Sequence, residues 1–346
     1  MDELNPQYLL DWACDLGQTN PFWDFHIHPY NVLSADTQFY HPDPTVPGVY
    51  SQTSAPYHPP SLAGHSAGKP PDEDEKETHL SDRSFLLLSR ITYARVGPRV
   101  IADQLDLCGI RRALLLQVAR QPGDSERLMA AAGQMFPQGE QFHFSCAMPV
   151  GMPADKLDDF YRSARAQWGI SAIKIHTNLA GLDPTCPAGR AAIEATLVSA
   201  GRLGLPVVVH GGPSLGVEAS VAGLGRLEHL REINWGLSAA PVIMAHAGLY
   251  HLSDDEARAT LSIMRAMFDR HPNLFVDTSS LTLSSITRLL THLDRARLIF
   301  GSDALYKPVW EIWVRFLHAL RETSPHPDLD LVQIASFNPR HCLGLN

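Results

Sequence analysis

Five short apolar segments of this chain each end in residues that can bind a metal ion, and their order constrains the fold more than any other feature. These residues are His26 and His28, Lys174 with His176, His210, His246, and Asp303. Because side chains alternate along a strand, His26 and His28 point to the same side. In a parallel barrel the carboxyl ends of the strands converge at one mouth. The segments therefore predict one shared pocket that binds metal.

The length of the chain and the alternation of its segments predict an α/β protein with a single (β/α)8 TIM barrel. Its 346 residues suit one barrel of about 250 residues plus insertions. The apolar runs expected to form strands are 22–28, 113–119, 142–150, 172–176, 207–210, 242–246, 274–277 and 298–301. Helical spacing of apolar residues predicts helices over 188–204 and 254–270, another around Trp310–Leu320, and a last one near 328–336. We therefore expect residues 1–346 to form one barrel domain.

Composition excludes several classes of function. No apolar run reaches the roughly 18 residues of a membrane span, and a net charge of -9 argues against nucleic acid as a partner. The acidic N-terminus, Met1–Asn5, predicts no secretion signal. Five cysteines without a CxxC pair favour reduced thiols in a cytoplasm. We expect a soluble, cytoplasmic protein that acts on a small molecule, and a homo-oligomer is compatible with this.

One region interrupts the barrel pattern. Residues 34–84 are rich in Pro, Ser, Gly and His, include the acidic run 72–77, and show no apolar periodicity. Because this insertion follows the first strand, its ends are expected at the mouth of the barrel. Two interpretations remain open: a solvated loop, or a lid that covers the substrate.

Several short sequence segments resemble those of a known group of enzymes. The segments in question are 169–176 (GISAIKIH), 245–248 (AHAG), 274–279 (LFVDTS), 300–303 (FGSD) and 338–345 (NPRHCLGL). Together with the ordered strand-end residues, they are similar to the amidohydrolase-related branch of the metal-dependent amidohydrolase superfamily. The resemblance covers nearly the whole chain except 34–84.

The resemblance implies a role for each strand-end residue. The implied metal ligands are His26, His28, Lys174, His210, His246 and Asp303. Asp303 would also transfer a proton, and His246 would bind a second metal or polarise the substrate. Lys174 would be carboxylated and bridge two metals, whereas a simple salt bridge is the alternative. The cofactor implied is one or two divalent ions per chain, with zinc as first choice and manganese or iron as alternatives.

The function implied is that of a hydrolase that uses metal-activated water to cleave a C–N or C–O bond, or a C–C bond, of a small organic substrate. The first alternative is a nonoxidative, metal-dependent decarboxylase of an aromatic or unsaturated acid. The second is an inactive barrel that serves as a partner subunit. Candidate substrate-binding residues are Arg120, Lys307 and His176, although His176 could equally be structural. The loops that set substrate identity carry no recognisable signature.

Overall fold

The computed structural model describes residues 5–30, 32, 98–136 and 139–345. The predicted insertion at 34–84 lies outside the described residues. That the chain is a single barrel domain with this insertion stays a prediction.

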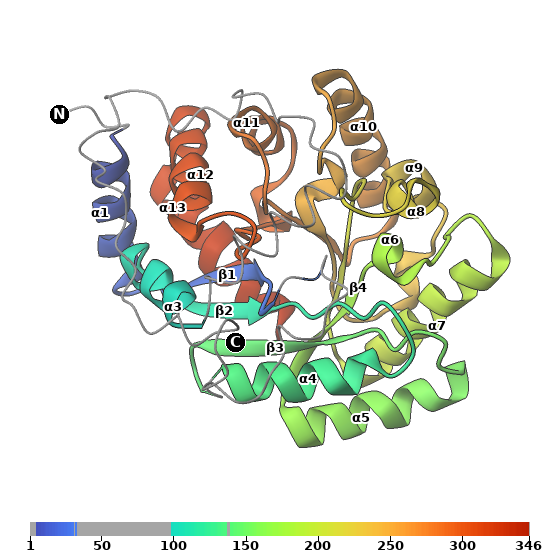
Figure 1. Ribbon diagram of the computed structural model, residues 1–346. Helices are drawn as coiled ribbons and strands as arrows, with labels where there is room; N and C mark the ends of the chain where they lie inside the picture. Colours follow the sequence, from blue (N-terminus) through green and yellow to red (C-terminus); the bar gives the residue numbers. More distant parts are fainter. Residues whose placement is uncertain (1–4, 31, 33–97, 137–138, 346) are drawn as a thin grey trace. The chain divides into compact units, whose positions relative to one another are not determined.

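Eight strands follow one another in sequence order in one sheet, β1 to β8. They are β1 (Phe22–Ile27), β2 (Ile110–Leu115), β3 (Phe142–Ala147), β4 (Ile170–Ile175), β5 (Val207–Val209), β6 (Val242–Met244), β7 (Leu274–Asp277) and β8 (Leu298–Ile299). The pairs from β3 to β7 are parallel, and helices alternate with the strands (Figure 1). This is the (β/α)8 TIM-barrel fold, as predicted.

The helices have the following bounds: α1 (Pro6–Gly17), α3 (Pro98–Leu107), α4 (Asp124–Met135), α5 (Leu157–Trp168), α6 (Thr177–Ala180), α7 (Pro187–Leu203), α8 (Ala219–Ala222), α9 (Leu227–Leu230), α10 (Asp254–Arg270), α11 (Leu283–His292), α12 (Val309–Thr323), α13 (Pro327–Val332) and α14 (Asn338–Cys342). Within the described ranges, no helix has the length and apolar character that crossing a membrane requires.

Two compact units can be distinguished. Unit 1 comprises the described residues of Met1–Ala113 and Thr278–Pro339. Its core is aromatic: Trp313 of α12 lies 5.7 Å from Phe22 and 4.4 Å from Phe300, measured between ring centroids. Each fully buried aromatic side chain contributes roughly 1.5–3 kcal/mol to folding. Helix α12 contacts α1, α3, α11 and α13.

Unit 2 comprises Leu114–Asp277 and the described residues of Arg340–Asn346. Its strands β5 and β6 are fully buried apolar runs, as expected for parallel strands covered on both faces. Helices α4 and α5 pack on β3 (Figure 1). The capping box of α10, formed by Ser253 and Glu256, explains why that helix begins where it does.

The predicted strands and helices are present, but several boundaries differ, and most strands end one to four residues before the predicted run does. The second strand begins at Ile110, three residues before the predicted run, because Arg111 and Arg112 at its start hid the apolar pattern. The guanidinium of Arg112 lies 5.5 Å from the ring of Trp23, so this polar residue packs on an aromatic face. The helix expected near 328–336 ends at Val332 and continues as a π-helical turn. Helix α1 was not predicted.

Candidate metal centre and active site

The carboxyl end of β1 presents two imidazoles to one side of the strand. The Nε2 atoms of His26 and His28 lie 3.3 Å apart, and the exposed fractions of these residues are 0% and 4%. Strand alternation is the cause, since Phe25 and Ile27 occupy the opposite face. Gly301 permits the packing, because a Cβ atom at this position would lie 2.7 Å from the Cβ of His26.

Asp303 follows β8 and brings a carboxylate to the two imidazoles. Its Oδ1 atom lies 3.5 Å from Nε2 of His26 and 3.2 Å from Nε2 of His28. The φ angle of Asp303 is 65°, in the left-handed region that residues other than glycine rarely occupy. Its backbone N–H donates to the carbonyl of His26 at 2.8 Å, which supports this conformation. Strained backbone of this kind concentrates at functional sites.

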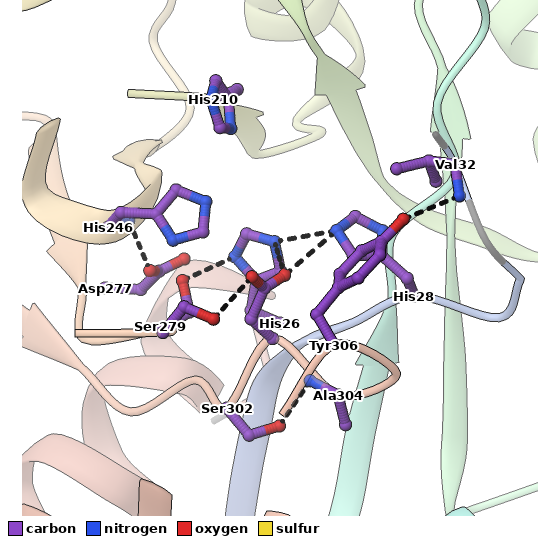
Figure 2. A network of polar contacts seen from close by, with 12 residues as sticks. His26, His28, Val32, His210, His246, Asp277, Ser279, Ser302, Ala304 and Tyr306 are labelled. Atoms are coloured by element: carbon purple, nitrogen blue, oxygen red, sulfur yellow. Dashed lines mark hydrogen bonds and ion pairs between the residues drawn. The ribbon is translucent and has the colours of Figure 1, made fainter. Parts of the chain in front are cut away.

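Two consecutive serines contact these donor groups on their other sides. Oγ of Ser279 lies 3.0 Å from Nδ1 of His26 (Figure 2). Oγ of Ser280 donates to Oδ2 of Asp303 at 2.7 Å. A partner at Nδ1 orients the ring so that Nε2 faces the other imidazole and the carboxylate. A partner at Oδ2 fixes the rotation of the carboxylate in the same way.

Two imidazole nitrogens and one carboxylate oxygen form a donor set that suits a divalent transition metal. Three protein ligands of these types are found at catalytic zinc sites, which keep a further position open. The three residues are at most 4% exposed, and the serine contacts are the outer contacts that such ligands usually make. These residues therefore fit a divalent cation. We name His26, His28 and Asp303 the histidine–aspartate group.

Asp24 supports this group through the backbone. Its Oδ1 atom accepts the N–H of His26 at 3.1 Å and the N–H of Ser302 at 2.9 Å. The residue is fully buried, so one carboxylate ties β1 to the segment after β8. The ring of Tyr306 contacts that of His28, with ring centroids 5.6 Å apart. The hydroxyl of Tyr306 accepts the N–H of Val32 (Figure 2).

The other predicted ligands belong to unit 2. Lys174 of β4 is 1% exposed, and its Cα partners are Ala147 on β3 and Val208 on β5. A protonated amine cannot bind a cation, so Lys174 can be a ligand only after carboxylation. That modification stays a prediction.

Rings stack at the carboxyl ends of β4 and β5. The ring centroids of His176 and His210 lie 4.0 Å apart with an interplanar angle of 8°. Nδ1 of His176 accepts the N–H of Leu179 at 3.4 Å and caps α6, whereas Nε2 of His210 lies 3.1 Å from Oγ of Ser214. His176 therefore has a structural contact, and its predicted contact with substrate stays a prediction.

His246 lies in the turn that follows β6. Its φ angle is 55°, and its N–H donates to Oδ1 of Asp277 at 2.7 Å (Figure 2). The ring centroid lies 5.0 Å from that of His210 and 4.5 Å from that of Tyr250. We name the set made of Lys174, His176, His210 and His246 the lysine–histidine group.

The two predicted carboxylate-binding cations are both half-buried. The backbone N–H of Arg120, after β2, donates to Oδ2 of Asp124 at 2.9 Å. Burial raises the pKa of Asp124, but hydrogen bonds from Arg127 and from the N–H groups of Arg120 and Gln121 outweigh it and lower the pKa. Lys307 follows β8 in unit 1. Their roles in substrate binding stay predictions.

Within unit 1 the structure brings together His26, His28 and Asp303. Within unit 2 it brings together the rings of His176, His210 and His246. That the six predicted ligands form one metal centre stays a prediction. Among the contacts just described, sequence reasoning missed Ser280, Ser214, Tyr250, Tyr306 and Asp277. Asp277 was detectable, because it ends an apolar strand with a carboxylate as Asp303 does. Ser280 carried no signal of its own, because serine is common in turns.

Comparisons with known proteins agree with the fold. A sequence model of the amidohydrolase family matches residues 23–345. A search of curated proteins found no match.

The chain resembles many solved structures, including the following three. A 5-carboxyvanillate decarboxylase from Novosphingobium aromaticivorans, with bound manganese and 3-methoxy-4-hydroxy-5-nitrobenzoic acid, has a TM-score of 0.56 at 15% identity over 95% of this chain and 98% of that one. A 4-oxalomesaconate hydratase from Rhodopseudomonas palustris has a TM-score of 0.51 at 14% identity over 94% and 96%. An amidohydrolase from Burkholderia multivorans with bound zinc has a TM-score of 0.52 at 13% identity over 75% and 92%. At these identities the likeness shows the fold alone.

Proposed function

This chain belongs to the amidohydrolase family of metal-dependent enzymes, and on that premise we propose that it hydrolyses a C–N or C–O bond of a small organic substrate. The observation that carries the proposal is the histidine–aspartate group, in which a carboxylate oxygen lies within 3.5 Å of two imidazole nitrogens. When bound there, a divalent cation supplies Lewis-acid polarisation and lowers the pKa of water from about 15.7 towards 7.

The protein's own groups have distinct tasks in this proposal. Oδ1 of Asp303 faces the two Nε2 atoms, so we assign proton transfer to Oδ2, where the Ser280 hydroxyl already donates. Asp303 takes a proton from the attacking water there and passes it to the leaving group. We assign His246 to polarise the substrate carbonyl, because its backbone is fixed by Asp277 and its ring by Tyr250.

Labelled water tests the hydrolytic step directly. Turnover in ¹⁸O-enriched water should place one labelled oxygen in the product, because the oxygen of water becomes part of it. Release of carbon dioxide with no label gained would contradict hydrolysis.

Decarboxylation is the second candidate, and one observation favours it. The decarboxylase from Novosphingobium aromaticivorans shares this fold over 95% of the chain, and its structure contains a substituted benzoic acid. Two residues favour hydrolysis: Lys174, which after carboxylation would bridge two metals, and Asp303, which is the candidate base for water. The oxygen label separates the two reactions, since a decarboxylase takes a proton from solvent and no oxygen. The intact histidine–aspartate group counts against the third alternative, an inactive subunit.

Zinc is the proposed ion, with manganese and iron as alternatives, and Lys174 is proposed to be carboxylated. The similar structures contain manganese in one case and zinc in another, and two imidazoles with a carboxylate suit all three metals. Elemental analysis of protein purified without added metal tests the choice.

A small-molecule substrate and a cytoplasmic location complete the proposal. All five cysteines are unpaired, and burial raises the pKa of the Cys108 and Cys146 thiols, which keeps them in the unreactive protonated form. Unpaired thiols suit a reducing compartment.

A further inference from the structure

The segment after β2 contains a fully buried glutamine whose side chain has no hydrogen-bond partner among the described residues. Gln117 is 0% exposed, and no residue in the described part of the chain hydrogen-bonds its Oε1 or Nε2. A buried amide without partners costs free energy, and such groups in native proteins usually have an explanation. A packed leucine would be more stable at this position unless the amide has a ligand.

A second polar group next to it is only partly used. Oγ of Ser145 on β3 accepts the backbone N–H of Gln117 at 3.0 Å. Ser145 is also 0% exposed, and its hydroxyl donates to no group among the described residues. One donor of Ser145 and both functions of the Gln117 amide therefore remain available at one place.

Strand register places Ser145 on the face of the sheet that carries Lys174. The register between β3 and β4 shifts between Phe144 and Ser145, which pairs Ser145 with Ala172 and Ala147 with Lys174. Residues two apart share a face, so Ser145 lies on the face of Lys174. Register shifts of this kind are common next to active sites, where they redirect side chains.

Gln117 lies two residues beyond the end of β2 at Leu115. Its backbone N–H donates to Oγ of Ser145, so the residue lies beside the strand position that shares a face with Lys174. Gln117 also follows the carboxyl end of its strand, where barrel enzymes bind substrate.

We propose that Gln117 and Ser145 form a recognition subsite for a neutral carboxamide or lactam edge of the substrate. A glutamine amide offers an N–H donor beside a carbonyl acceptor, and a carboxamide edge offers the complementary pair. A carboxylate has two acceptors and no donor, so it would satisfy Nε2 and be repelled by Oε1. The subsite thus selects a neutral group, unlike Arg120 and Lys307. This inference deepens the proposed function, because it assumes that the carboxyl ends of β2 to β4 face the substrate.

Three probes of equal ring size test the proposal on the intact, metal-containing protein by calorimetric titration. Benzamide has the carboxamide edge, benzoate is its anionic counterpart, and N,N-dimethylbenzamide lacks the N–H. Benzamide should bind at least about tenfold more tightly than either of the other two. Benzoate binding as tightly as benzamide, or benzamide showing no measurable binding, would overturn the proposal.

Variants distinguish recognition from packing. Gln117→Leu should weaken benzamide binding at least about tenfold without lowering the melting temperature, because it removes a buried group without partners. Gln104→Leu is the matched control: Gln104 is 5% exposed, and its Oε1 accepts the N–H of Val309 at 2.7 Å. This control should lower the melting temperature and leave benzamide binding unchanged. Unchanged binding in Gln117→Leu, or lost binding together with a lower melting temperature, would assign Gln117 to the core and overturn the proposal.

These outcomes are independent of the metal chemistry. A product without labelled oxygen, together with intact benzamide binding, would contradict only the proposed reaction. A labelled product without benzamide binding would contradict only the proposed subsite.

Discussion

The histidine–aspartate group and the lysine–histidine group are built from similar residues but supported differently. In unit 1, the three donor atoms approach within 3.5 Å of one another, and hydroxyls contact the far sides of His26 and Asp303. In unit 2, the imidazoles are arranged by ring contacts 4.0–5.0 Å between centroids. In unit 2, the carboxylate of Asp277 accepts the backbone N–H of His246 at 2.7 Å.

This difference indicates which group is preorganised for a cation. Unit 1 supplies an anion among its predicted ligands, whereas the lysine–histidine group has amine and imidazoles and gains an anion only by carboxylation of Lys174. A dication removed from water needs anionic or well-oriented neutral ligands. We therefore expect the histidine–aspartate group to dominate metal affinity and the lysine–histidine group to depend on the modified lysine.

The largest expected effect follows from removing both imidazoles of unit 1. His26→Ala combined with His28→Ala should lower metal affinity by more than roughly 10³-fold, since even outer contacts of metal ligands contribute 10–100-fold. Elemental analysis and activity should both fall to background, while circular dichroism shows a folded protein. His318→Ala, which removes another buried histidine of unit 1, is the control and should retain metal. Stoichiometric metal in the double variant would reverse the ranking of the two groups.

Replacing Lys174 tests how much unit 2 contributes to metal binding. If Lys174 is carboxylated and bridges two ions, Lys174→Met should lower the metal content from about two ions per chain to one or fewer. Mass spectrometry of the intact protein under conditions that preserve carbamates should show one added carboxyl group. Unchanged metal content would leave Lys174 as an ordinary buried amine and make unit 2 a substrate-binding region.

The serines should have intermediate effects. Ser279→Ala and Ser280→Ala should each weaken metal binding about 10–100-fold, because each removes a contact that orients a donor group. Metal competition with a chromophoric chelator measures the affinity without turnover. Ser336→Ala is the matched control, since this serine is 1% exposed and its hydroxyl bonds no described residue. Equal affinities in all three variants would show that the preorganisation of unit 1 does not come from hydroxyls.

The donor residues of unit 1 were predictable, because the period of a strand places His26 and His28 on one side and an apolar run ends near Asp303. The contacts of Ser280 were not predictable. They depend on left-handed backbone at Ser280 and Asp303, with φ angles of 50° and 65°, which no local pattern indicates. The family match across 23–345 confirms the resemblance that these strand ends suggested.

In unit 2, the strand ends at His210 and His246 were equally visible in the sequence, but the ring contacts were not. The left-handed turn at His246, with a φ of 55°, departs from strand alternation just where the ring direction is set. Gln117, whose side chain bonds no described residue, is also invisible to periodicity, because a buried glutamine simply lowers the apolar score of its segment.

The smallest predicted effect tests whether metal binding depends on the stability of unit 2. Glu256 of α10 in unit 2 accepts hydrogen bonds from the hydroxyl and N–H of Ser253 and from Arg226, which lower its pKa from 4.5 to about 2. A lowered pKa in the folded state means that the stabilisation is present above pH 4.5 and is lost as the pH falls towards 2. The side chain is 45% exposed, so solvent screens most of this effect.

Glu256→Gln should therefore lower the melting temperature at pH 7 by no more than about 2 °C, and the difference from the wild type should vanish near pH 2. A calorimetric series between these pH values measures it. Metal content at pH 7 should not change, because Glu256 belongs to the cap of α10 rather than to either donor group. A variant that lost metal at pH 7 would link the helix cap to the metal site. The contrast between the two groups would then reflect the stability of unit 2 rather than the chemistry of its ligands.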